Sequence, residues 1–176
     1  MSSLLLRAGN RAMIKAGDRL PDGVFRVKNE DDSVREVTTD ELFAGQRVVL
    51  VGVPGAFTAT CHNAHVPQFV ANAREMKARG VDRVVVVAVN DHHVMKMWRE
   101  SLGADDIDFV ADGTGAYARA LGLEVDMSGG GLGKRMRRFS ALAVDGVVKA
   151  LNLEPEGSRG VEATGAATLL RQLAEA

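Results

Sequence analysis

Hydrophobic residues along the chain form alternating strand-like and helix-like segments. Arg47–Val53, Arg83–Val89 and Ile107–Ala111 are continuous apolar runs rich in β-branched residues, which predicts strands buried on both faces. After Thr60, and again over Asp91–Leu102, apolar residues recur at three- and four-residue spacing, which predicts helices. Strands that alternate with helices in this way are typical of an α/β fold with parallel central strands.

Two β-hairpins are expected outside this alternating part. Val24–Lys28 and Val34–Val37 alternate between apolar and polar residues on either side of a polar turn. Phe139–Val144 and Val147–Leu153 are joined by Asp-Gly, the strongest short-range signal for a hairpin. The glycine-rich segment 129–133 is expected to be irregular and mobile. Three further helices are expected, over Thr39–Leu42, Ala116–Leu121 and Glu162–Leu173.

The order of these elements predicts an α/β sandwich with a central mixed sheet flanked by helices. The alternating part supplies the parallel strands, the last hairpin an antiparallel edge, and the first hairpin an N-terminal addition. No linker, repeat or low-complexity segment divides the chain, so a single domain is expected over residues 13–176. Met1–Ala12 is expected to be a short disordered extension, because its three leucines are too few for a signal-peptide core.

Composition narrows the partners and the compartment. The formal net charge of −1 gives no basic surface for nucleic acid, and Trp98 and Tyr117 are too few for a base-stacking stripe. No apolar run approaches the roughly 20 residues that a membrane helix needs, so no membrane partner is expected. The single cysteine, Cys61, excludes an intramolecular disulfide and fits a reducing compartment. A soluble, cytoplasmic protein is therefore expected.

Cys61 lies between a predicted strand and a predicted helix. The strand Arg47–Val53 ends at Pro54-Gly55, and the helical pattern begins directly after Thr60. In the first turn of a helix, unpaired backbone N–H groups favour an anion, and nearby cations favour the thiolate form of a cysteine. A lone cysteine is otherwise a small core hydrophobe. Its placement here favours a reactive thiol.

The residues around Cys61 resemble a known family. Pro54, Thr58 and Cys61 form Pro-x-x-x-Thr-x-x-Cys, which resembles the active-site signature of the peroxiredoxins, the thiol peroxidases of the thioredoxin-like fold. The fuller string Pro-Gly-Ala-Phe-Thr resembles the atypical type II branch, the peroxiredoxin-five subfamily. The resemblance extends from about Ile14 to the C-terminus. Further segments resemble the same branch: His65–Phe69, Val89–Asp91, Trp98, Ala111–Ala116, Arg138–Ser140 and Asp145–Asn152.

This resemblance implies a role for each of five residues. Cys61 is the nucleophile that peroxide oxidises to a sulfenic acid, and Thr58 and Arg138 are the other two catalytic residues. Pro54 and His65 support the pocket. The alternative for Thr58 is a helix N-cap.

Two neighbouring segments bear on these assignments. Arg138 is assigned as the catalytic arginine because it matches the Arg-Phe-Ser segment of the family; if this match were displaced by one residue, Arg137 would take that role. Strand alternation places Arg138 and Ser140 on one face. Lys134, Arg135 and Arg137 are interpreted as a solvated basic loop.

The resemblance also implies substrates and partners. The expected substrates are hydrogen peroxide and alkyl hydroperoxides, with no cofactor and no metal. Because no second cysteine can resolve the sulfenic acid, an external thiol must do so, and glutathione with glutaredoxin is favoured over thioredoxin. Ala59 stands where the family usually has proline, which predicts a more open thiol. A homodimer is expected, with contacts at Phe57 and Gly113–Tyr117.

Other kinds of site were weighed against this interpretation. Cys61 and His65 stand four residues apart, and His62, His92 and His93 are further possible zinc ligands, but no second cysteine or carboxylate cluster accompanies them. A Cys-His hydrolase dyad lacks an evident oxyanion pocket. A redox sensor or chaperone-like module could use the same thiol. A disulfide reductase would need a Cys-x-x-Cys pair, which the sequence does not contain.

Overall fold

The computed structural model describes residues 12–175, which fold around one large sheet and one small sheet. The large sheet contains the seven strands β1 (Val24–Lys28), β2 (Val34–Thr38), β3 (Arg47–Val53), β4 (Arg83–Ala88), β5 (Asp108–Ala111), β8 (Phe139–Val144) and β9 (Val147–Leu153). The small sheet pairs β6 (Glu124–Asp126) with β7 (Lys134–Met136). The helices are α1 (Thr39–Phe43), α2 (Val66–Ala78), α3 (His92–Ser101), α4 (Ala116–Leu121) and α5 (Ala166–Glu175).

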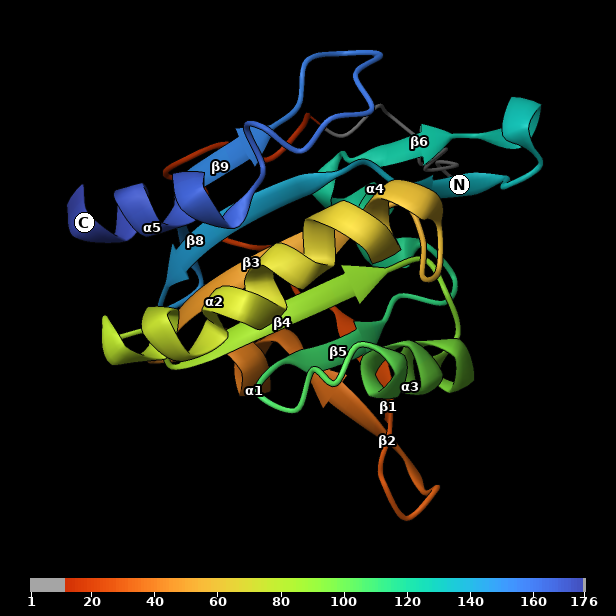
Figure 1. The fold of residues 1–176 in the computed structure, drawn as a ribbon, viewed down its shortest axis with the longest axis horizontal. Helices are drawn as coiled ribbons and strands as arrows, with labels where there is room; N and C mark the ends of the chain where they lie inside the picture. Colours follow the sequence, from red (N-terminus) through yellow and green to blue (C-terminus); the bar gives the residue numbers. More distant parts are fainter. Residues whose placement is uncertain (1–11, 176) are drawn as a thin grey trace, which may run out of the picture.

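The large sheet is mixed, with strand order β2-β1-β5-β4-β3-β8-β9. Its centre, β3, β4 and β5, is parallel, and β8 joins β3 in the antiparallel direction. The N-terminal hairpin continues this sheet, because β1 pairs with β5 through Arg26 and Ala111. Helices cover both faces of the sheet, with α2 lying across β3 and β4 (Figure 1). The predicted α/β class is confirmed as a thioredoxin-like fold with a mixed sheet flanked by helices.

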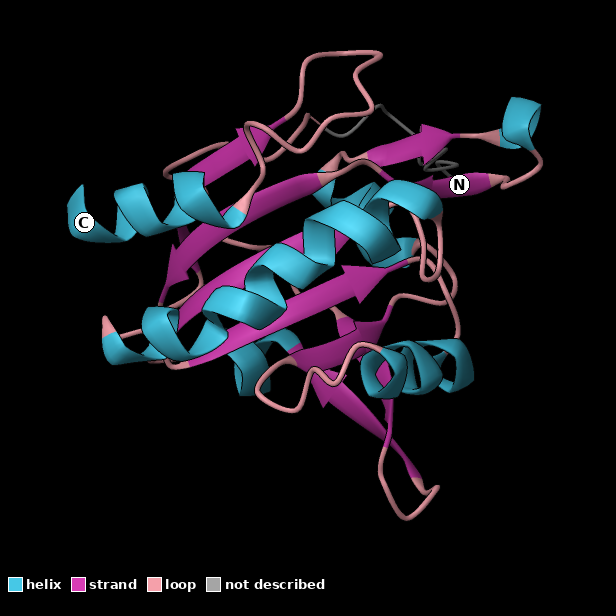
Figure 2. Cartoon of the chain, viewed as in Figure 1, coloured by secondary structure: helices cyan, strands magenta, loops and turns pink. Residues whose placement is uncertain are grey.

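Alternate residues of the central strands serve two separate cores. Val49 and Val51 of β3 pack into the cluster beneath α2, α3 and α5. Val48 and Leu50 pack into the cluster on the opposite face, beside α1 and α4. All four are essentially inaccessible to solvent, which explains why β3 has no polar face in the sequence. The layered arrangement is visible in Figure 2.

The structure differs from the sequence-based prediction in several local places. β6 and β7 were not expected, since the glycine-rich segment 129–133 between them was predicted to be irregular. The last helix begins at Ala166 rather than Glu162. Helix α1 ends at Phe43 rather than Leu42, and it is capped by the hydroxyl of Thr38, which accepts from the N–H of Glu41.

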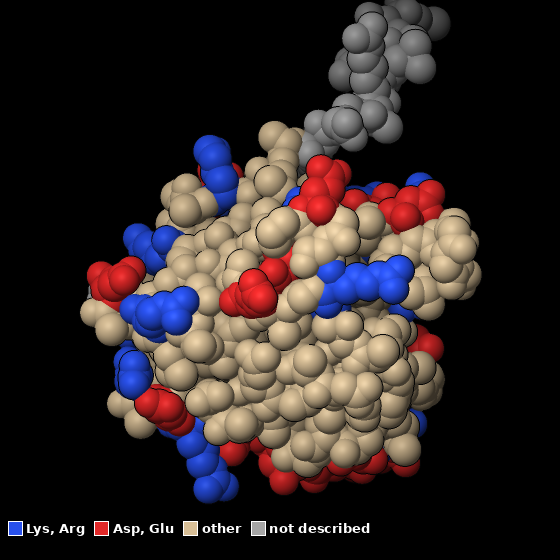
Figure 3. Space-filling model, turned by 45° about the horizontal axis from the view of Figure 1, so that its top comes forward, with Lys and Arg blue, Asp and Glu red and all other residues tan. Residues whose placement is uncertain are grey.

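The expected extension over residues 1–12 lies outside the described part of the chain, except for residue 12. None of the helices within the described part is both long enough and apolar enough to cross a membrane. Basic and acidic side chains are interspersed around a broad uncharged area on the face shown in Figure 3.

Candidate active site

Cys61 follows the last residue of β3 by eight positions and stands at the start of the helical segment that becomes α2. Residues Cys61–His65 form a π-helical turn, in which the N–H of Val66 donates to the carbonyl of Cys61. The side chain is buried, with 1% of its surface exposed. The expected position between a strand and a helix is therefore confirmed. The thiol is buried although Ala59 stands where the family usually has proline.

Arg138 approaches the sulfur from the start of β8. Its Nη2 donates to Cys61 Sγ at 3.2 Å, across 77 residues of sequence. The register of β8 on β3 makes this approach possible: Gly52 lies opposite Phe139, and a Cβ at residue 52 would overlap the Phe139 ring. Phe139 thus lies flat over one face of β3, and Arg138 extends to the other, as strand alternation predicts.

Arg137 turns away from the sulfur. Its Nη2 donates to the backbone carbonyl of Glu154 at 3.0 Å. Arg138 and not Arg137 is therefore the arginine that contacts Cys61.

His65 connects Arg138 to the loop before α5. Arg138 Nη1 lies 2.8 Å from His65 Nδ1, and His65 Nε2 lies 3.0 Å from the carbonyl of Thr164. Because a guanidinium can only donate, Nδ1 must accept, and Nε2 therefore carries the proton that is donated to Thr164. Thr164 is itself held by Glu154 Oε1, which accepts from its N–H and its hydroxyl at 2.9 and 2.8 Å. The neutral histidine thus fixes the orientation of Arg138.

Burial and, to a smaller extent, the charge of Arg138 lower the pKa of His65 to about 4, against the opposing effects of the hydrogen bond to Thr164 and the charge of Glu154. Burial raises the pKa of Glu154, but the hydrogen bonds from Thr164 outweigh it, so the pKa of this carboxyl is lowered. Both shifts favour the charge states that the hydrogen bonds require: a neutral imidazole and an ionised carboxylate.

We expect the free energy of unfolding to decrease as the pH is lowered, because of His65. The unfolded chain protonates this histidine near pH 6.5, whereas the folded chain resists protonation until about pH 4. The free energy of unfolding is therefore expected to decrease by about 2 kcal/mol between pH 7 and pH 5 from this group alone. Urea unfolding across that range measures it. His65→Gln should flatten the slope, and the exposed His93→Gln should not; an unchanged slope in His65→Gln would contradict the assignment.

The loop from Pro54 to Thr58 is fixed by hydrogen bonds to the carbonyl and the N–H of the Gly55–Ala56 peptide group. The Thr58 hydroxyl donates to the carbonyl of Gly55 at 2.7 Å, and the N–H of Ala56 donates to Asn90 Oδ1 at 2.9 Å. Phe57 has φ 60°, a left-handed conformation that costs a residue with a side chain about 1–2 kcal/mol. Since the one proton of the Thr58 hydroxyl is used on Gly55, its lone pairs are left to accept from another group.

Two aromatic residues contact His62, the residue that follows Cys61. Trp98 Nε1 donates to His62 Nδ1 at 3.0 Å, and the ring of Phe57 stacks on His62 with centroids 5.5 Å apart. Trp98 is fully buried, whereas half of the Phe57 surface is exposed. The residue after Cys61 is thus held between a buried and an exposed aromatic ring.

The geometry bears on the rival interpretations. Both ring nitrogens of His65 are engaged, one by Arg138 and the other by Thr164, so neither is directed at a metal or at the thiol as a general base. Within residues 12–175, no group of three or more His, Cys, Asp or Glu is placed to hold a metal ion.

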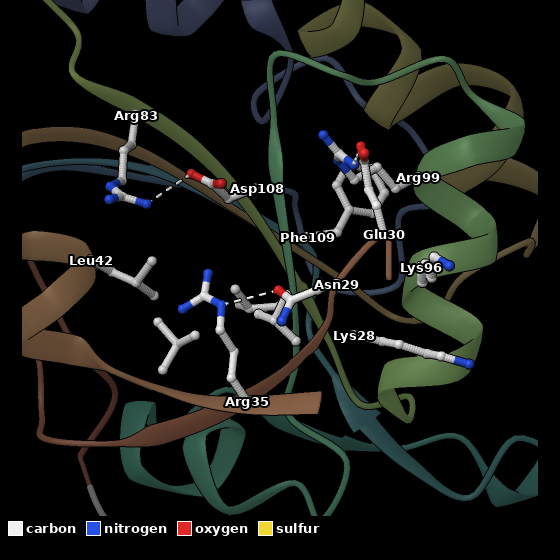
Figure 4. Close-up of a pocket in the computed structure, with 13 residues that line it drawn as sticks. Lys28, Asn29, Glu30, Arg35, Leu42, Arg83, Lys96, Arg99, Asp108 and Phe109 are labelled. Carbon is white, nitrogen blue, oxygen red and sulfur yellow. Dashed lines mark hydrogen bonds and ion pairs between the residues drawn. The ribbon is translucent and has the colours of Figure 1, made fainter. Parts of the chain in front are cut away.

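A cavity of about 180 Å³ lies elsewhere, among β1, β2, β4, β5, α1 and α3 (Figure 4). It shares no residue with the five candidate positions. Its cations are paired within the chain: Arg35 donates to Asn29 and Arg83 to Asp108, as the dashed lines in Figure 4 mark. This cavity is therefore separate from the thiol.

The structure brings Cys61, Arg138 and His65 into one chain of contacts, with Pro54 and Thr58 in the adjoining loop. Sequence reasoning did not identify the supporting groups Glu154, Thr164, Asn90 and Trp98. Asn90 and Trp98 stand in segments that carry the family resemblance, which was the only signal available for them. Glu154 and Thr164 had no such signal.

A buried, arginine-contacted thiol at the carboxyl end of a central strand in a thioredoxin-like fold defines a thiol-based redox protein. Comparison with known proteins is more specific. The Redoxin family model matches residues 15–170. Peroxiredoxin-2C of Oryza sativa subsp. japonica is 45% identical over 163 residues, which cover 92% of this chain and 99% of that protein. Peroxiredoxin-2B of Arabidopsis thaliana is 44% identical over 147 residues, 83% of this chain and 91% of that protein.

Solved structures agree with the sequence relatives. The crystal structure of reduced Prx3 from Vibrio vulnificus in complex with hydrogen peroxide superposes with a TM-score of 0.85 at 40% identity, covering 92% of this chain and 99% of that one. The chain belongs to the peroxiredoxins, in the atypical type II branch, and is a one-cysteine member of it. It is therefore a thiol peroxidase, an oxidoreductase.

Proposed function

We propose that the chain reduces hydrogen peroxide and small alkyl hydroperoxides through Cys61, with Thr58 and Arg138 as the other catalytic residues. The observation that carries this proposal is the 3.2 Å contact between Arg138 Nη2 and Cys61 Sγ, because it places a permanent cation on the only thiol of the chain. The Vibrio vulnificus relative was crystallised with hydrogen peroxide, which supports the same substrate here.

The chemistry follows from these contacts. The Cys61 thiolate attacks one peroxide oxygen, the O–O bond breaks, and the cysteine becomes a sulfenic acid. The departing oxygen takes the proton of the attacked oxygen and leaves as water or an alcohol, and a proton from solvent converts the resulting sulfenate to the sulfenic acid. Arg138 stabilises the negative charge that moves from sulfur to oxygen during this step. Thr58, whose own proton is donated to Gly55, accepts a hydrogen bond from the peroxide and aligns it with the sulfur.

An external thiol then restores Cys61. The chain has no second cysteine, so the sulfenic acid cannot close an internal disulfide. Glutathione would form a mixed disulfide with Cys61, releasing water, and glutaredoxin would open it by thiol exchange. We favour this route over thioredoxin, which would have to attack the sulfenic acid or a mixed disulfide directly.

Two measurements test these steps. Near-stoichiometric hydrogen peroxide is expected to convert Cys61 to a sulfenic acid, seen by intact mass with a sulfenic trap, and an unreactive Cys61 in the folded protein would reject the function. Steady-state peroxide loss is then compared with glutathione plus glutaredoxin and with thioredoxin plus its reductase. Faster turnover with glutathione and a glutathione adduct on Cys61 are expected. Robust turnover with thioredoxin and no such adduct would reject the reductant while leaving the peroxidase intact.

We further propose a cytoplasmic homodimer. Phe57 exposes half of its surface next to the site, which supports a contact there, as do the exposed residues Gly113 and Thr114. Tyr117 is buried against Phe25 within the chain, so its side chain does not take part. Sedimentation at micromolar protein that shows only monomers would reject the dimer.

A further inference from the structure

Arg135 reaches from the small sheet to the loop that precedes Cys61. Its Nη1 donates to the carbonyl of Pro54 at 3.3 Å, across 81 residues of sequence, and its Nε donates to the carbonyl of Leu132 at 2.8 Å. The side chain is half-buried. The sequence places it in a solvated basic loop, but in the structure one guanidinium joins the glycine-rich turn to the active-site loop.

Gly55 leaves the space that this guanidinium occupies. A Cβ at residue 55 would lie 2.6 Å from Arg135 Nη1 and 3.2 Å from Thr58 Cγ2. Any side chain at this position would therefore displace the guanidinium or press on the threonine. The glycine of the Pro-Gly pair is thus explained by the approach of Arg135 and not only by the turn.

The loop depends on such contacts. Backbone groups of three consecutive residues are held: the carbonyl of Pro54 by Arg135, the carbonyl of Gly55 by Thr58, and the N–H of Ala56 by Asn90. They are followed directly by Phe57 in its left-handed conformation. A strained residue persists only where the surroundings over-determine its conformation. Arg135 provides the contact at the start of this series.

We propose that Arg135 is a positioning residue for the peroxidase reaction. By bridging the carbonyls of Pro54 and Leu132, it holds the loop in the conformation that presents Thr58 to a peroxide at Cys61. This inference rests on the proposed function and adds a residue, and a distant turn, to the machinery of the same site.

The glycine-rich turn sets the position of Arg135. Leu132, whose carbonyl accepts from Arg135, lies between Gly131 and Gly133, which have φ 79° and 69°. A Cβ at Gly133 would meet no atom within 4 Å, so Gly133→Ala would strain only the backbone. Gly129 is equally open but is not in a left-handed conformation, so Gly129→Ala is the matched control.

Trp98 offers a direct readout of the first chemical step. It is the only tryptophan, it is buried, and it donates to the residue that follows Cys61. Stopped-flow fluorescence after mixing reduced protein with hydrogen peroxide therefore yields the second-order rate constant for oxidation of Cys61. The rate of Cys61 alkylation by iodoacetamide, measured in parallel, reports access to the thiol without any need to align a peroxide.

Arg135→Met is expected to lower the oxidation rate constant about 10-fold or more, because a misplaced loop misaligns the peroxide. Alkylation should change by less than about twofold, since the thiol itself is not altered. Arg135→Lys, which keeps one donor group, should recover part of the loss. The exposed neighbour Lys134→Met should oxidise at the wild-type rate. Gly133→Ala should slow oxidation more than Gly129→Ala. The double variant Gly133→Ala/Arg135→Met should oxidise no more slowly than Arg135→Met alone.

Wild-type oxidation rates in both Arg135→Met and Gly133→Ala would overturn the proposal. So would faster alkylation with no recovery in Arg135→Lys, because that result would mean a loosened fold. If Arg135→Met does not fold, the oxidation rate of Gly133→Ala is compared with that of Gly129→Ala, and equal rates would overturn the proposal. A wild-type chain that hydrogen peroxide fails to oxidise would instead reject the proposed function, so the two failures are distinguishable.

Discussion

Arg138→Ala is expected to lower kcat/KM for hydrogen peroxide by about 10²–10³-fold, with little change in how fast an external thiol restores the enzyme. The guanidinium is the only cation that contacts Cys61 Sγ in the described part of the chain, so its removal takes away the charge that stabilises the reacting sulfur and the departing oxygen. The loss should appear in the oxidation step, measured by single-turnover kinetics.

Arg137→Ala is the matched control for this variant. It removes a guanidinium one residue away that donates to the carbonyl of Glu154 and not to the sulfur. A stability decrease of about 1 kcal/mol is expected, from one lost hydrogen bond, with kcat/KM near the wild-type value. An active Arg138→Ala combined with an inactive Arg137→Ala would show that the two roles are exchanged in solution.

Thr58→Val is expected to lower kcat/KM by about 10²-fold, because valine has the same shape but neither donates to Gly55 nor accepts from a peroxide. Thr58→Ser keeps the hydroxyl and should be much less affected. Peroxide saturation curves for both variants, alongside thermal unfolding, separate the loss of alignment from loss of stability. Equal activity in Thr58→Val and the wild type would reduce Thr58 to an element of the loop.

Most of the large sheet could be predicted because its strands carry strong local signals. The continuous apolar runs of β3 and β4 and the Asp-Gly turn between β8 and β9 specify their structure within a few residues. The short strands β6 and β7 carry no such signal. Their three residues each are mostly polar, and their pairing depends on contacts that are far apart in the sequence.

The site residues, too, include some that a local sequence signal identifies and others that only long-range contacts identify. Cys61 could be recognised from its place between a strand and a helix, and the motif that includes Pro54 and Thr58 was local. The contacts of Arg138 with His65, and of Arg135 with Pro54, join residues more than 70 positions apart. In the sequence, Arg135 is one of several neighbouring basic residues and was interpreted as part of a solvated loop. Only the tertiary structure distinguishes it, as a positioning arginine, from its exposed neighbour Lys134.

The π-helical turn at Cys61–His65 changes the helical phase of the thiol relative to the rest of α2. An α-helix advances about 100° per residue, so residues five apart would point about 140° away from each other. With α-helical geometry, Cys61 would point about 140° away from Val66 and about 80° away from Phe69. The π turn takes up one extra residue, and Cys61 joins Val66 and Phe69 in the same buried cluster. The extra residue therefore lets one helix accommodate both the spacing of its apolar stripe and the position of the thiol.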